Sequence, residues 1–558
     1  MYNCCGDTMN KKKLCSLKKK LNKYQTKLDK LNEKTKKHFL IEYKINKLIK
    51  KIELLKDIIN IHETENKEFV KEKVSLLKEE HKRHEILYGN IVSTILMVCM
   101  PIALYSFFNS FYELIDSVMC ASIDPISVSN VAALSQVKNA IRAFGMGLGG
   151  GGGVLVARYY GANRMKDAKK SVGNLFFLTL AMSAFIILLM VPMSSIIVSL
   201  VCNGGPDVQL YFSLQTFELA IIAINTIWIA IEKVKGNSKR ILSLNLIVLV
   251  IKLSLNAVFV YWIKVDSIVW IEVSSIIAQS FLCVIAIKTL FSSKNILRVE
   301  TKYIKPESMY IIPILKLSIP VFLGKFVMNI GKLSVNILSD QFYGEVTGGL
   351  IVGALAVSNN LSGLITSPTN SFEEGESSIV SQNLGNKNAD RTLKVFYKSA
   401  IIIMTISLIG YICVRFLFLD ELVNLFKNTK DDLNAEESLK LVAYIKEIFV
   451  YDSLSIPTLG ITACVLGLLY GYGKTFLSSI LNFSRIGTRI ITLLILYWVN
   501  GPDDYQSVGI AMGISNIVIM LLSIIFLLIF LSNFKEESQK AIEKIEKKKQ
   551  EKAKLNQN

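Results

Sequence analysis

Charged side chains interrupt several long apolar stretches of this sequence. Glu113 and Asp116 lie three residues apart, so they would share one face of a helix. Lys138 and Arg142 lie four residues apart and would do the same. An ionisable group at membrane depth costs about 2.5–3.5 kcal/mol unless it is paired or hydrated. The two pairs therefore predict a hydrated cleft that binds charged species. Structural ion pairs or water-facing side chains are the alternative.

A second group of charges occurs in other apolar stretches. Lys325 and Lys332 are seven residues, or two helical turns, apart. Glu218 and Asp452 lie in the outer halves of two further stretches. We expect both acids to line the same cleft, and structural pairing with Lys252 or a loop is the alternative.

The sequence contains no recognisable catalytic motif. Gly473-Lys474-Thr475 ends like a nucleotide-binding loop, but Leu468 stands where that loop requires its first glycine. The glycines at 149–153 follow no predicted strand, which favours close helix packing or local bending over phosphate binding. All four histidines precede residue 85, and the nine cysteines include no C-x-x-C pair. We expect no enzyme, no cofactor and no metal site.

Polar and apolar residues are segregated along the chain. The 558 residues are 51% hydrophobic with a mean hydropathy of +0.41, yet their net charge is +19. A helix needs about 20 apolar residues to cross a bilayer. We predict an all-α, polytopic membrane protein with about twelve transmembrane helices. The predicted spans are 87–115, 126–157, 172–201, 208–232, 241–263, 268–291, 311–338, 348–380, 395–419, 440–470, 476–500 and 505–533.

The loops carry their basic residues on one side of this arrangement. Loops after the even-numbered spans contain Lys or Arg, whereas 120–127, 202–208 and 501–507 contain none. Basic loops stay in the cytoplasm, and residues 1–85 lack the apolar segment of a signal peptide. We therefore expect a multi-pass protein of the cell membrane with both termini in the cytoplasm. The excess positive charge is expected to face the anionic lipid bilayer and not nucleic acid.

The chain contains an internal repeat. Met100-Pro101 corresponds to Ile319-Pro320, and residues 156–163 correspond to 380–387, at separations of 219 and 224 residues. Repeated halves build the substrate site of many secondary transporters at their interface. We predict two pseudo-symmetric six-helix bundles. The predicted domains are a basic extension (1–85), the first bundle (86–292), a cytoplasmic linker (293–310), the second bundle (311–534) and a charged cytoplasmic tail (535–558).

The repeat places opposite charges at corresponding positions. At an offset of 219 residues, Lys332 is the counterpart of Glu113. We hypothesise that Lys332 or Lys138 is a tethered counter-ion for Glu113 and Asp116, released when a transported cation takes its place. The acids at positions 373, 374 and 376 fall toward the cytoplasmic end of their span. We interpret them as solvated or gate residues.

Three segments resemble a known transporter family. They are residues 147–162 (GLGGGGGVLVARYYGA), 371–388 (SFEEGESSIVSQNLGNKN) and 482–485 (NFSR). Over about residues 87–533, the chain is similar to the multidrug and toxic compound extrusion (MATE) family. This resemblance implies a V-shaped pair of six-helix bundles that exchanges Na⁺ or H⁺ for an organic substrate.

The resemblance also implies roles for single residues. In this family an acid near the end of the first span is associated with cation coupling, and Asp116 occupies that place. Many relatives carry an Asn and an Asp four residues apart in the fifth span, where this chain has Asn256 and Val260. Others have a Glu at the position of Met328. An acid of the tenth span lines the cleft in part of the family, which implies this role for Asp452.

The candidate residues fall into two groups. The candidates for cation coupling are Asp116, Glu113 and Asn256. The candidates for the substrate cleft are Asp452, Glu218, Lys138, Arg142, Lys325 and Lys332.

Residues 14–85 are an addition to the plan of such a transporter. Apolar residues alternate at spacings of three and four from 14 to 31 and, after a phase slip, from 41 to 59. This spacing predicts a coiled coil or a helical hairpin. The segment is expected to form a homodimer, recruit a cytoplasmic partner or lie on the inner leaflet. A solvated helix without a partner is the alternative.

Three functions fit these patterns. The first is a Na⁺- or H⁺-coupled antiporter that exports amphipathic organic compounds by alternating access. The second is a flippase or exporter of a lipid-linked or anionic substrate, favoured by the basic residues of the cleft. The third is a membrane-anchored interaction protein that acts through its coiled coil.

Overall fold

The structure is a computed structural model that describes residues 15–28, 49, 52–61, 67–121, 125–201, 205–265, 267–424 and 432–555. Within these ranges, the side chains of 67–69, 113–121, 125–133, 201, 432–438, 545 and 547–555 are not described. The part of the chain so described forms helices and loops and contains no strand. It divides into two compact units, one of residues 1–85 with 291–298 and one of residues 86–290 with 299–558.

The first unit contains helices at 15–28 and 52–61 and the start of α3 (Lys67–Tyr88). On α3, the Ser75 hydroxyl donates to the Lys294 carbonyl at 3.0 Å. The Ile296 N–H donates to the Glu79 carboxylate at 2.8 Å. Residues 291–298, where the predicted linker begins, therefore bind to the extension. Much of the predicted coiled coil, including residues 29–48, lies outside the described residues.

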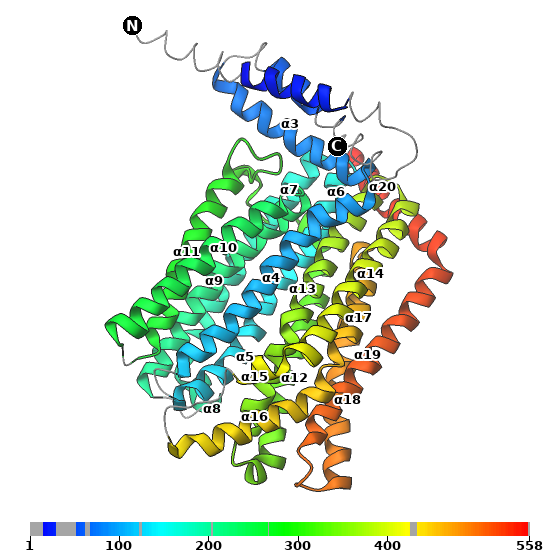
Figure 1. Ribbon diagram of the computed structural model, residues 1–558. Coiled ribbons are helices and arrows are strands. Elements are labelled where there is room, and N and C mark those ends of the chain that lie inside the picture. Colours follow the sequence, from blue (N-terminus) through cyan, green and yellow to red (C-terminus); the bar gives the residue numbers. More distant parts are fainter. Residues whose placement is uncertain are drawn as a thin grey trace. The chain divides into compact units, whose positions relative to one another are not determined.

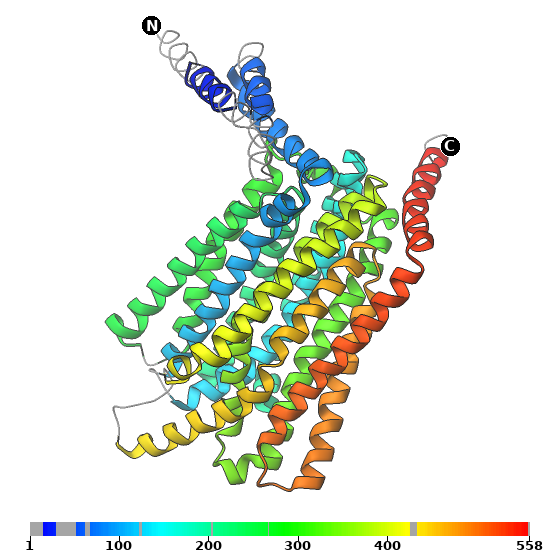
Figure 2. The ribbon, with the colours of Figure 1, turned by 45° about the vertical axis from the view of Figure 1, so that its right-hand side comes forward.

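The second unit holds the apolar helices of both predicted halves, which run along a common direction in Figures 1 and 2. The first half consists of α4 (Ile91–Ala121), α5 (Pro125–Gly147), η1 (Leu148–Gly152), α6 (Gly153–Gly161), α7 (Met165–Met190), α8 (Ser194–Val201), α9 (Pro206–Val234), α10 (Ser238–Ala257), η2 (Val258–Ile263) and α11 (Val269–Phe291). The short helix η3 (Thr301–Tyr303) follows. The second half consists of α12 (Ser308–Thr347), α13 (Ile351–Gly385), α14 (Ala389–Ile412), η4 (Cys413–Leu417), α15 (Leu419–Asn424), α16 (Asp432–Asp452), α17 (Ser455–Gly471), α18 (Phe476–Asn500) and α19 (Gln506–Ser532), and α20 (Phe534–Leu555) forms the tail.

The number of membrane-crossing helices agrees closely with the prediction. Among the described residues, ten helices are long and apolar enough to cross a membrane. An eleventh span is formed if α16 and α17, which meet at a 41° bend, count as one. The remaining predicted span, the eighth at 348–380, is the helix α13, which is too rich in Ser, Asn and Glu to pass the same test. Helices α4, α14 and α17 pack around α13 (Figure 1), so few of its side chains need to be compatible with lipid.

Large apolar side chains on the outer helices are exposed. Leu188 and Leu200 are 76% and 80% exposed, and Trp262 and Trp498 are 83% and 86% exposed. Lipid would cover these side chains in a bilayer, and tryptophan is enriched near its interfaces. The exposed surface is therefore that of a multi-pass membrane protein.

The glycine-rich segment at 147–153, which runs from the end of α5 through η1 into α6, permits close helix packing, as the sequence predicts. A Cβ atom on Gly147 or Gly151 would overlap the backbone of α12 at Ser318. The helix widens to a π-helix over η1, so it also changes its local winding at the glycines. Helices from the two halves can thus approach closely at this point.

The predicted repeat is visible in the turns that end α6 and α13. Asn163 and Lys387, which are 224 residues apart, both have a positive φ, of 57° and 59°. The N–H of Asn163 donates to the Tyr160 carbonyl, and the N–H of Lys387 donates to the Leu384 carbonyl. The two segments thus repeat in conformation as well as in sequence.

These two turns also pack on each other. A Cβ on Gly161 would overlap the backbone of Gln382, and a Cβ on Gly385 would overlap the backbone of Arg158. Since Gly161 corresponds to Gly385 and Arg158 corresponds to Gln382, the two contacts are related by a pseudo-twofold axis. The close approach requires glycine at both positions.

Two long side chains extend this symmetric contact to the ends of neighbouring helices. Arg158 donates from Nη2 to the Gly471 carbonyl at the end of α17, at 2.9 Å. Gln382 donates from Nε2 to the Val234 carbonyl at the end of α9, also at 2.9 Å. Each side chain therefore holds the end of a helix in the opposite half, at the face predicted to be cytoplasmic.

Candidate functional site

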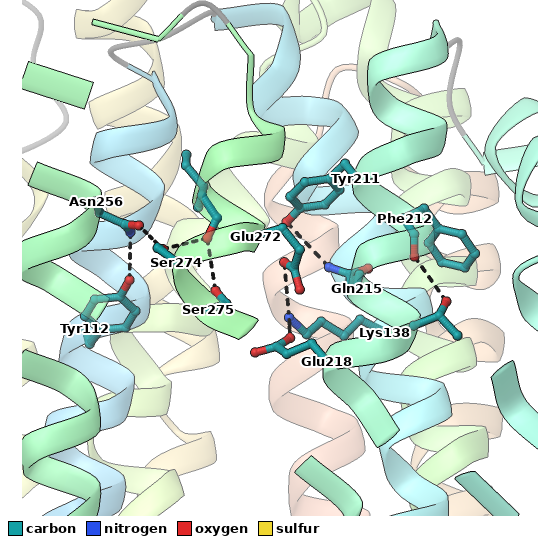
Figure 3. Close-up of polar contacts among 12 residues, drawn as sticks. Tyr112, Lys138, Tyr211, Phe212, Gln215, Glu218, Asn256, Glu272, Ser274 and Ser275 are labelled. Atoms are coloured by element: carbon teal, nitrogen blue, oxygen red, sulfur yellow. Dashed lines mark hydrogen bonds and ion pairs between the residues drawn. The ribbon is translucent and has the colours of Figure 1, made fainter. Parts of the chain in front are cut away.

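A buried ion-pair cluster lies inside the first half, and we call Lys138, Glu218 and Glu272 the carboxylate cluster. Lys138 of α5 forms ion pairs with Glu218 of α9 and, at 3.7 Å, with Glu272 of α11 (Figure 3). Glu218 is 3% exposed and Glu272 is 1% exposed. The second oxygen of Glu272, Oε1, has no hydrogen-bond partner among the described residues. One lysine is therefore shared by two buried carboxylates.

A second lysine balances the charge of this cluster. Lys252 of α10 is close enough to interact electrostatically with Glu218 and Glu272. The side chain of Lys138 is 19% exposed, against 5% and 2% for the two acids. Lys138 is therefore the member of the carboxylate cluster that water reaches most easily.

Glu272 is a residue that the sequence analysis missed. It lies at the fourth position of α11, inside a segment that was already predicted to span the membrane. The rule that singled out Glu218, an acid within an apolar span, would also have found Glu272. The predicted alternative partner of Glu218 was Lys252, and the structure places both lysines near this acid.

Asn256 lies in a hydrogen-bonded chain on the neighbouring helices. Its side-chain amide donates to the Tyr112 hydroxyl at 3.0 Å, and its oxygen accepts a hydrogen bond from Ser274 (Figure 3). The Lys252 ammonium lies 4.7 Å from the centre of the Tyr112 ring, a cation–π contact. Helix α10 therefore connects Asn256 to α4 and to α11.

The two acids expected to couple cation movement belong to α4. Glu113 and Asp116 follow Tyr112 by one and four residues, so Asp116 comes one helical turn after it. The side chains of Glu113 and Asp116 lie outside the described residues. Their predicted pairing with Lys138 or Lys332 stays a prediction.

Asp452 lies deep in the second half. It is 2% exposed and accepts hydrogen bonds on Oδ2 from Ser358 and Ser362 of α13, at 2.9 and 2.8 Å. Arg485 and Arg489 of α18 are close enough to interact with it electrostatically. We call Asp452, Arg485 and Arg489 the arginine cluster.

Both arginines of this cluster are buried. Arg489 is 2% exposed and donates from Nε to the Ser515 hydroxyl at 3.1 Å. Arg485 is 7% exposed, and its Nη1 donates to the sulfur of Met328 at 3.3 Å. Its Nε is buried without a hydrogen-bond partner. Arg485 was recognised only as part of a sequence motif, and the four-residue spacing to Arg489 was the signal that both share one helix face.

A third group of charges joins the two halves. Glu374 of α13 pairs with Lys233 of α9 at 2.8 Å and with Lys325 of α12 at 3.6 Å. These side chains and Glu373 line a cavity of about 20 Å³, which is room for about one water molecule. We call Lys233, Lys325, Glu373 and Glu374 the interface cluster.

The acids at positions 373, 374 and 376 were interpreted as solvated or gate residues. The interpretation as solvated is wrong for two of these three acids. Glu373 is 7% exposed and Glu376 is 0% exposed, because neighbouring helices cover both faces of α13. Glu374 is the most accessible, with 35% of its side chain exposed. The alternative interpretation as gate residues suits Glu374, since it binds basic residues of both halves.

The remaining cleft candidates lie on α5 and α12. Arg142 is half-buried and makes no hydrogen bond or ion pair with the described residues. Lys332 is half-buried on α12.

Among the described residues, no three His, Cys, Asp or Glu side chains are arranged to hold a metal ion. Among the candidate residues whose side chains are described, most charges belong to three clusters, one in each half and one between the halves.

A family model named MatE matches two segments of the chain, residues 101–258 and 320–495, which together are more than half of its length. A search of curated proteins gave no significant match. Among solved structures, a MOP superfamily transporter from Pyrococcus furiosus, described as having a binding pocket of reverse polarity that suggests a different function, has a TM-score of 0.73 at 17% identity. The match covers 81% of this chain and 98% of the other.

Two further solved structures show the same fold. A MATE transporter in complex with MaL6 has a TM-score of 0.73 at 18% identity, covering 81% of this chain and 99% of its own. An outward-facing multidrug resistance MATE transporter of the MOP superfamily has a TM-score of 0.71 at 17% identity, covering 82% and 98%. This chain is therefore a multi-pass membrane transporter of the MatE family, the multidrug and toxic compound extrusion transporters.

Proposed function

We propose that this transporter exports amphipathic organic compounds in exchange for Na⁺ or H⁺, by alternating access of a cleft between its two halves. The observation that supports this most directly is the carboxylate cluster. Lys138 occupies the position between Glu218 and Glu272 that a mobile cation would take. Breaking a buried ion pair leaves an uncompensated charge, so Lys138 leaves at low cost only when another cation replaces it.

The coupling ion is proposed to bind in the first half, at Asp116, Glu113 and Asn256. Asn256 is 0% exposed and bonded to Tyr112, one turn before Asp116 on α4. The hydrogen bond from Asn256 to Tyr112 joins α10 to α4, and Lys252 of α10 interacts with the acids of the carboxylate cluster; both observations support a coupling site in this half. Occupation of this site is proposed to weaken the hold of the acids on Lys138.

The contacts between the halves support alternating access. Symmetric contacts of Arg158 and Gln382 join the ends of helices in opposite halves. Glu374 adds ion pairs to Lys233 and Lys325. We propose that these contacts close the cytoplasmic side and must break before the cleft opens there.

The proposal is tested by transport in vesicles that contain the purified protein. Efflux of fluorescent amphipathic compounds, one cationic and one anionic, is measured under an imposed Na⁺ gradient and, separately, under a pH gradient. We expect one gradient to drive efflux in the wild type, and Lys138→Met to reduce this dependence at least tenfold. Lys302→Met serves as the matched control, because Lys302 is exposed and pairs only with loop residues. An efflux rate that depends on neither gradient, or that is unchanged in Lys138→Met, would contradict the proposal.

The extension is proposed to act on the cytoplasmic side, through a homodimer or a cytoplasmic partner. The distribution of basic loops supports a cytoplasmic location of both termini. Glu79 on α3 is buried and binds the backbone of residue 296, which connects the two bundles. Transport that continues after deletion of residues 1–85 would show that the extension only modulates the bundles. Loss of transport on this deletion, together with normal transport in Asp116→Asn, would favour a membrane-anchored interaction protein instead.

A further inference from the structure

The arginine cluster carries an excess positive charge at membrane depth. Two guanidinium groups face one carboxylate, so the cluster has a net charge of +1. Among the described residues, the charged groups that interact with Arg485 are Arg489 and Asp452, and the one that interacts with Arg489 is Asp452. An uncompensated charge in a low-dielectric interior is costly unless a counter-charge accompanies it.

Among the described side chains, no second carboxylate supplies this counter-charge. The single carboxylate, Asp452, already accepts hydrogen bonds from Ser358 and Ser362. No ion pair within 4.0 Å joins it to either arginine, although all three side chains are described. Among the described side chains, the two arginines therefore outnumber the acid beside them.

The donors of Arg485 point to a missing acceptor. A guanidinium has five N–H donors, yet the hydrogen bond of Arg485 in the described structure goes to a methionine sulfur, a weak acceptor. Its Nε is buried and unpartnered. A planar fork of this kind matches the two oxygens of a carboxylate or phosphate.

Arg489 lies too far from both ends of α18 to reach water at the membrane surface. Arg489 is eleven residues from the C-terminal end of α18 and thirteen from its N-terminal end, which corresponds to about 16 Å or more along the helix axis. An arginine side chain is much shorter than this distance, so snorkelling does not relieve the charge. The ligand of these arginines must come to them.

Helices that face the opposite half also line this cluster. Arg485 contacts Met328 of α12, and Asp452 contacts Ser358 and Ser362 of α13. Helix α12 packs against α5 of the first half, and α13 packs against α4. The guanidinium of Arg485 thus lies one helix away from the interface between the halves.

We propose that Arg485 and Arg489 form an oxyanion-binding subsite, and that the exported compound carries a carboxylate, phosphate or sulfonate group on an apolar body. This inference rests on the proposed export function and specifies its substrate class. Asp452 limits the strength of the subsite, since it offsets one of the two positive charges. The bound anion is held by the second half, while the coupling cation is held by the first.

The test compares two fluorescent amphiphiles that differ only in their head group. Binding of a dansyl-labelled alkyl carboxylate and of the matching dansyl-labelled alkyl trimethylammonium is measured on the full-length protein in detergent. We expect the wild type to prefer the carboxylate, and Arg485→Met to weaken carboxylate binding at least tenfold while leaving cation binding unchanged. Arg485→Lys should restore part of the affinity, because it keeps the charge but loses the planar fork.

Asp452→Asn is expected to change carboxylate binding in the opposite direction. A misfolded variant would not bind the probe more tightly, so this result distinguishes a lost subsite from misfolding. This variant keeps an acceptor for Ser358 and Ser362 but raises the net charge of the cluster to +2. We expect it to bind the carboxylate probe more tightly than the wild type. Carboxylate binding that is unchanged in Arg485→Met, or weakened in Asp452→Asn, would overturn the proposal.

Two further features complete the test. Competition with phosphate identifies the source of the anion, and the absence of a gradient distinguishes this proposal from the proposed ion coupling. If inorganic phosphate at millimolar concentration displaces the carboxylate probe, the subsite takes a free anion and the substrate class is wrong. If phosphate does not displace it, the anionic group belongs to the organic compound. Binding is measured at equilibrium without any gradient, so the result does not depend on cation coupling. A failure of cation coupling is thereby distinguished from a failure of the oxyanion subsite.

Discussion

At the scale of single residues, the membrane interior of this transporter separates acidic from basic sites. In the first half, Lys138 lies between Glu218 and Glu272. In the second half, the two positive charges of Arg485 and Arg489 exceed the one negative charge of Asp452. The two halves share a fold and an internal repeat, yet two lysines balance the two acids in the first half, whereas two arginines interact with one acid in the second. This difference suits the exchange of a cation for a compound with an anionic group.

Removal of Lys138 should destabilise the first half. Lys138→Met leaves Glu218 and Glu272 close together with less compensation, and loss of one partner of a buried ion pair costs about 3–5 kcal/mol. We expect a marked decrease in the melting temperature in detergent. The double variant Lys138→Met with Glu272→Gln should recover part of the loss, because one buried charge is removed with the other. A double variant no more stable than the single one would show that Glu272 does not interact with Lys138.

The residues of the sites were partly predictable. The presence of Lys138, Glu218 and Asp452 in apolar stretches was enough to predict that they lie in a polar interior. Their partners were not predictable, because contacts between helices depend on rotation about each helix axis, which hydropathy does not determine. The pairing of Lys138 with Glu218 is of this kind, and so is the contact between Arg485 and Met328.

At the scale of the elements, some helices begin and end close to the predicted positions, whereas α12 extends to Thr347, well beyond the predicted 311–338, and the predicted span 172–201 is divided between α7 and α8. The predicted spans at 268–291 and 476–500 correspond to α11 and α18 within one residue. Long apolar runs fix such limits, because each helix must match the thickness of the bilayer. The bend between α16 and α17 and the π-helices were not predicted, since local winding depends on tertiary packing.

The glycines at the ends of α6 and α13 should be equally intolerant of a side chain. Gly161→Ala and Gly385→Ala each place a methyl group against the backbone of the opposite half. Overpacking of this kind costs about 1–3 kcal/mol. The control is Gly363→Ala in α13, where a Cβ would meet open space. Melting temperatures should fall for both interface variants and stay unchanged or rise for the control. Tolerance of alanine at only one of the two glycines would contradict the symmetric contact.

The loop before α12 should loosen in acid. Hydrogen bonds from Lys302 and Lys169 lower the pKa of Glu300 from its ordinary 4.5 to about 2. Because this pKa is depressed in the folded protein, its contribution to stability is present above about pH 4.5. The contribution is lost as the pH falls toward 2. Pepsin should therefore cleave residues 299–306 faster as the pH falls from 4 to 2.

Glu300→Gln provides the reference for this measurement. The variant cannot ionise at position 300, so its cleavage reports only the pH dependence of pepsin itself. The ratio of wild-type to variant cleavage should rise toward one as the pH falls. A ratio that stays constant between pH 4 and 2 would contradict the assigned role of Glu300.

At the scale of the whole transporter, the two halves meet through a symmetric set of contacts. The repeat that the sequence revealed at 156–163 and 380–387 is also the place where the halves touch. Sequence could show that the segments are equivalent but not that they pack on each other. That contact depends on the arrangement of the two bundles, which no local pattern records.

Weakening this contact should open the cytoplasmic side. Arg158→Ala and Gln382→Ala each remove one hydrogen bond to a helix end in the opposite half. A loss of about 1–2 kcal/mol corresponds to a change of roughly 5- to 30-fold in the balance of closed and open states. The readout is the rate of thiol labelling at Cys99, which is buried between α4 and α13, in a variant that retains this cysteine alone. Both substitutions should raise the rate, and exposed Lys302→Ala should not. Equal labelling rates in all three variants would show that these hydrogen bonds do not hold the cytoplasmic side closed.

The polarity of α13 has a consequence for how the protein is made. As it leaves the ribosome, this helix carries three glutamates and several serines and asparagines, so it cannot partition into lipid alone. Its surroundings in the finished protein include α4 and α6, synthesised before it, and α14 and α17, synthesised after it. Helix α13 must therefore wait at the translocon, or beside α4, until those later helices arrive to enclose it. Assembly of this transporter is thereby tied to the order of its translation, and a chain that stops after α13 would be degraded.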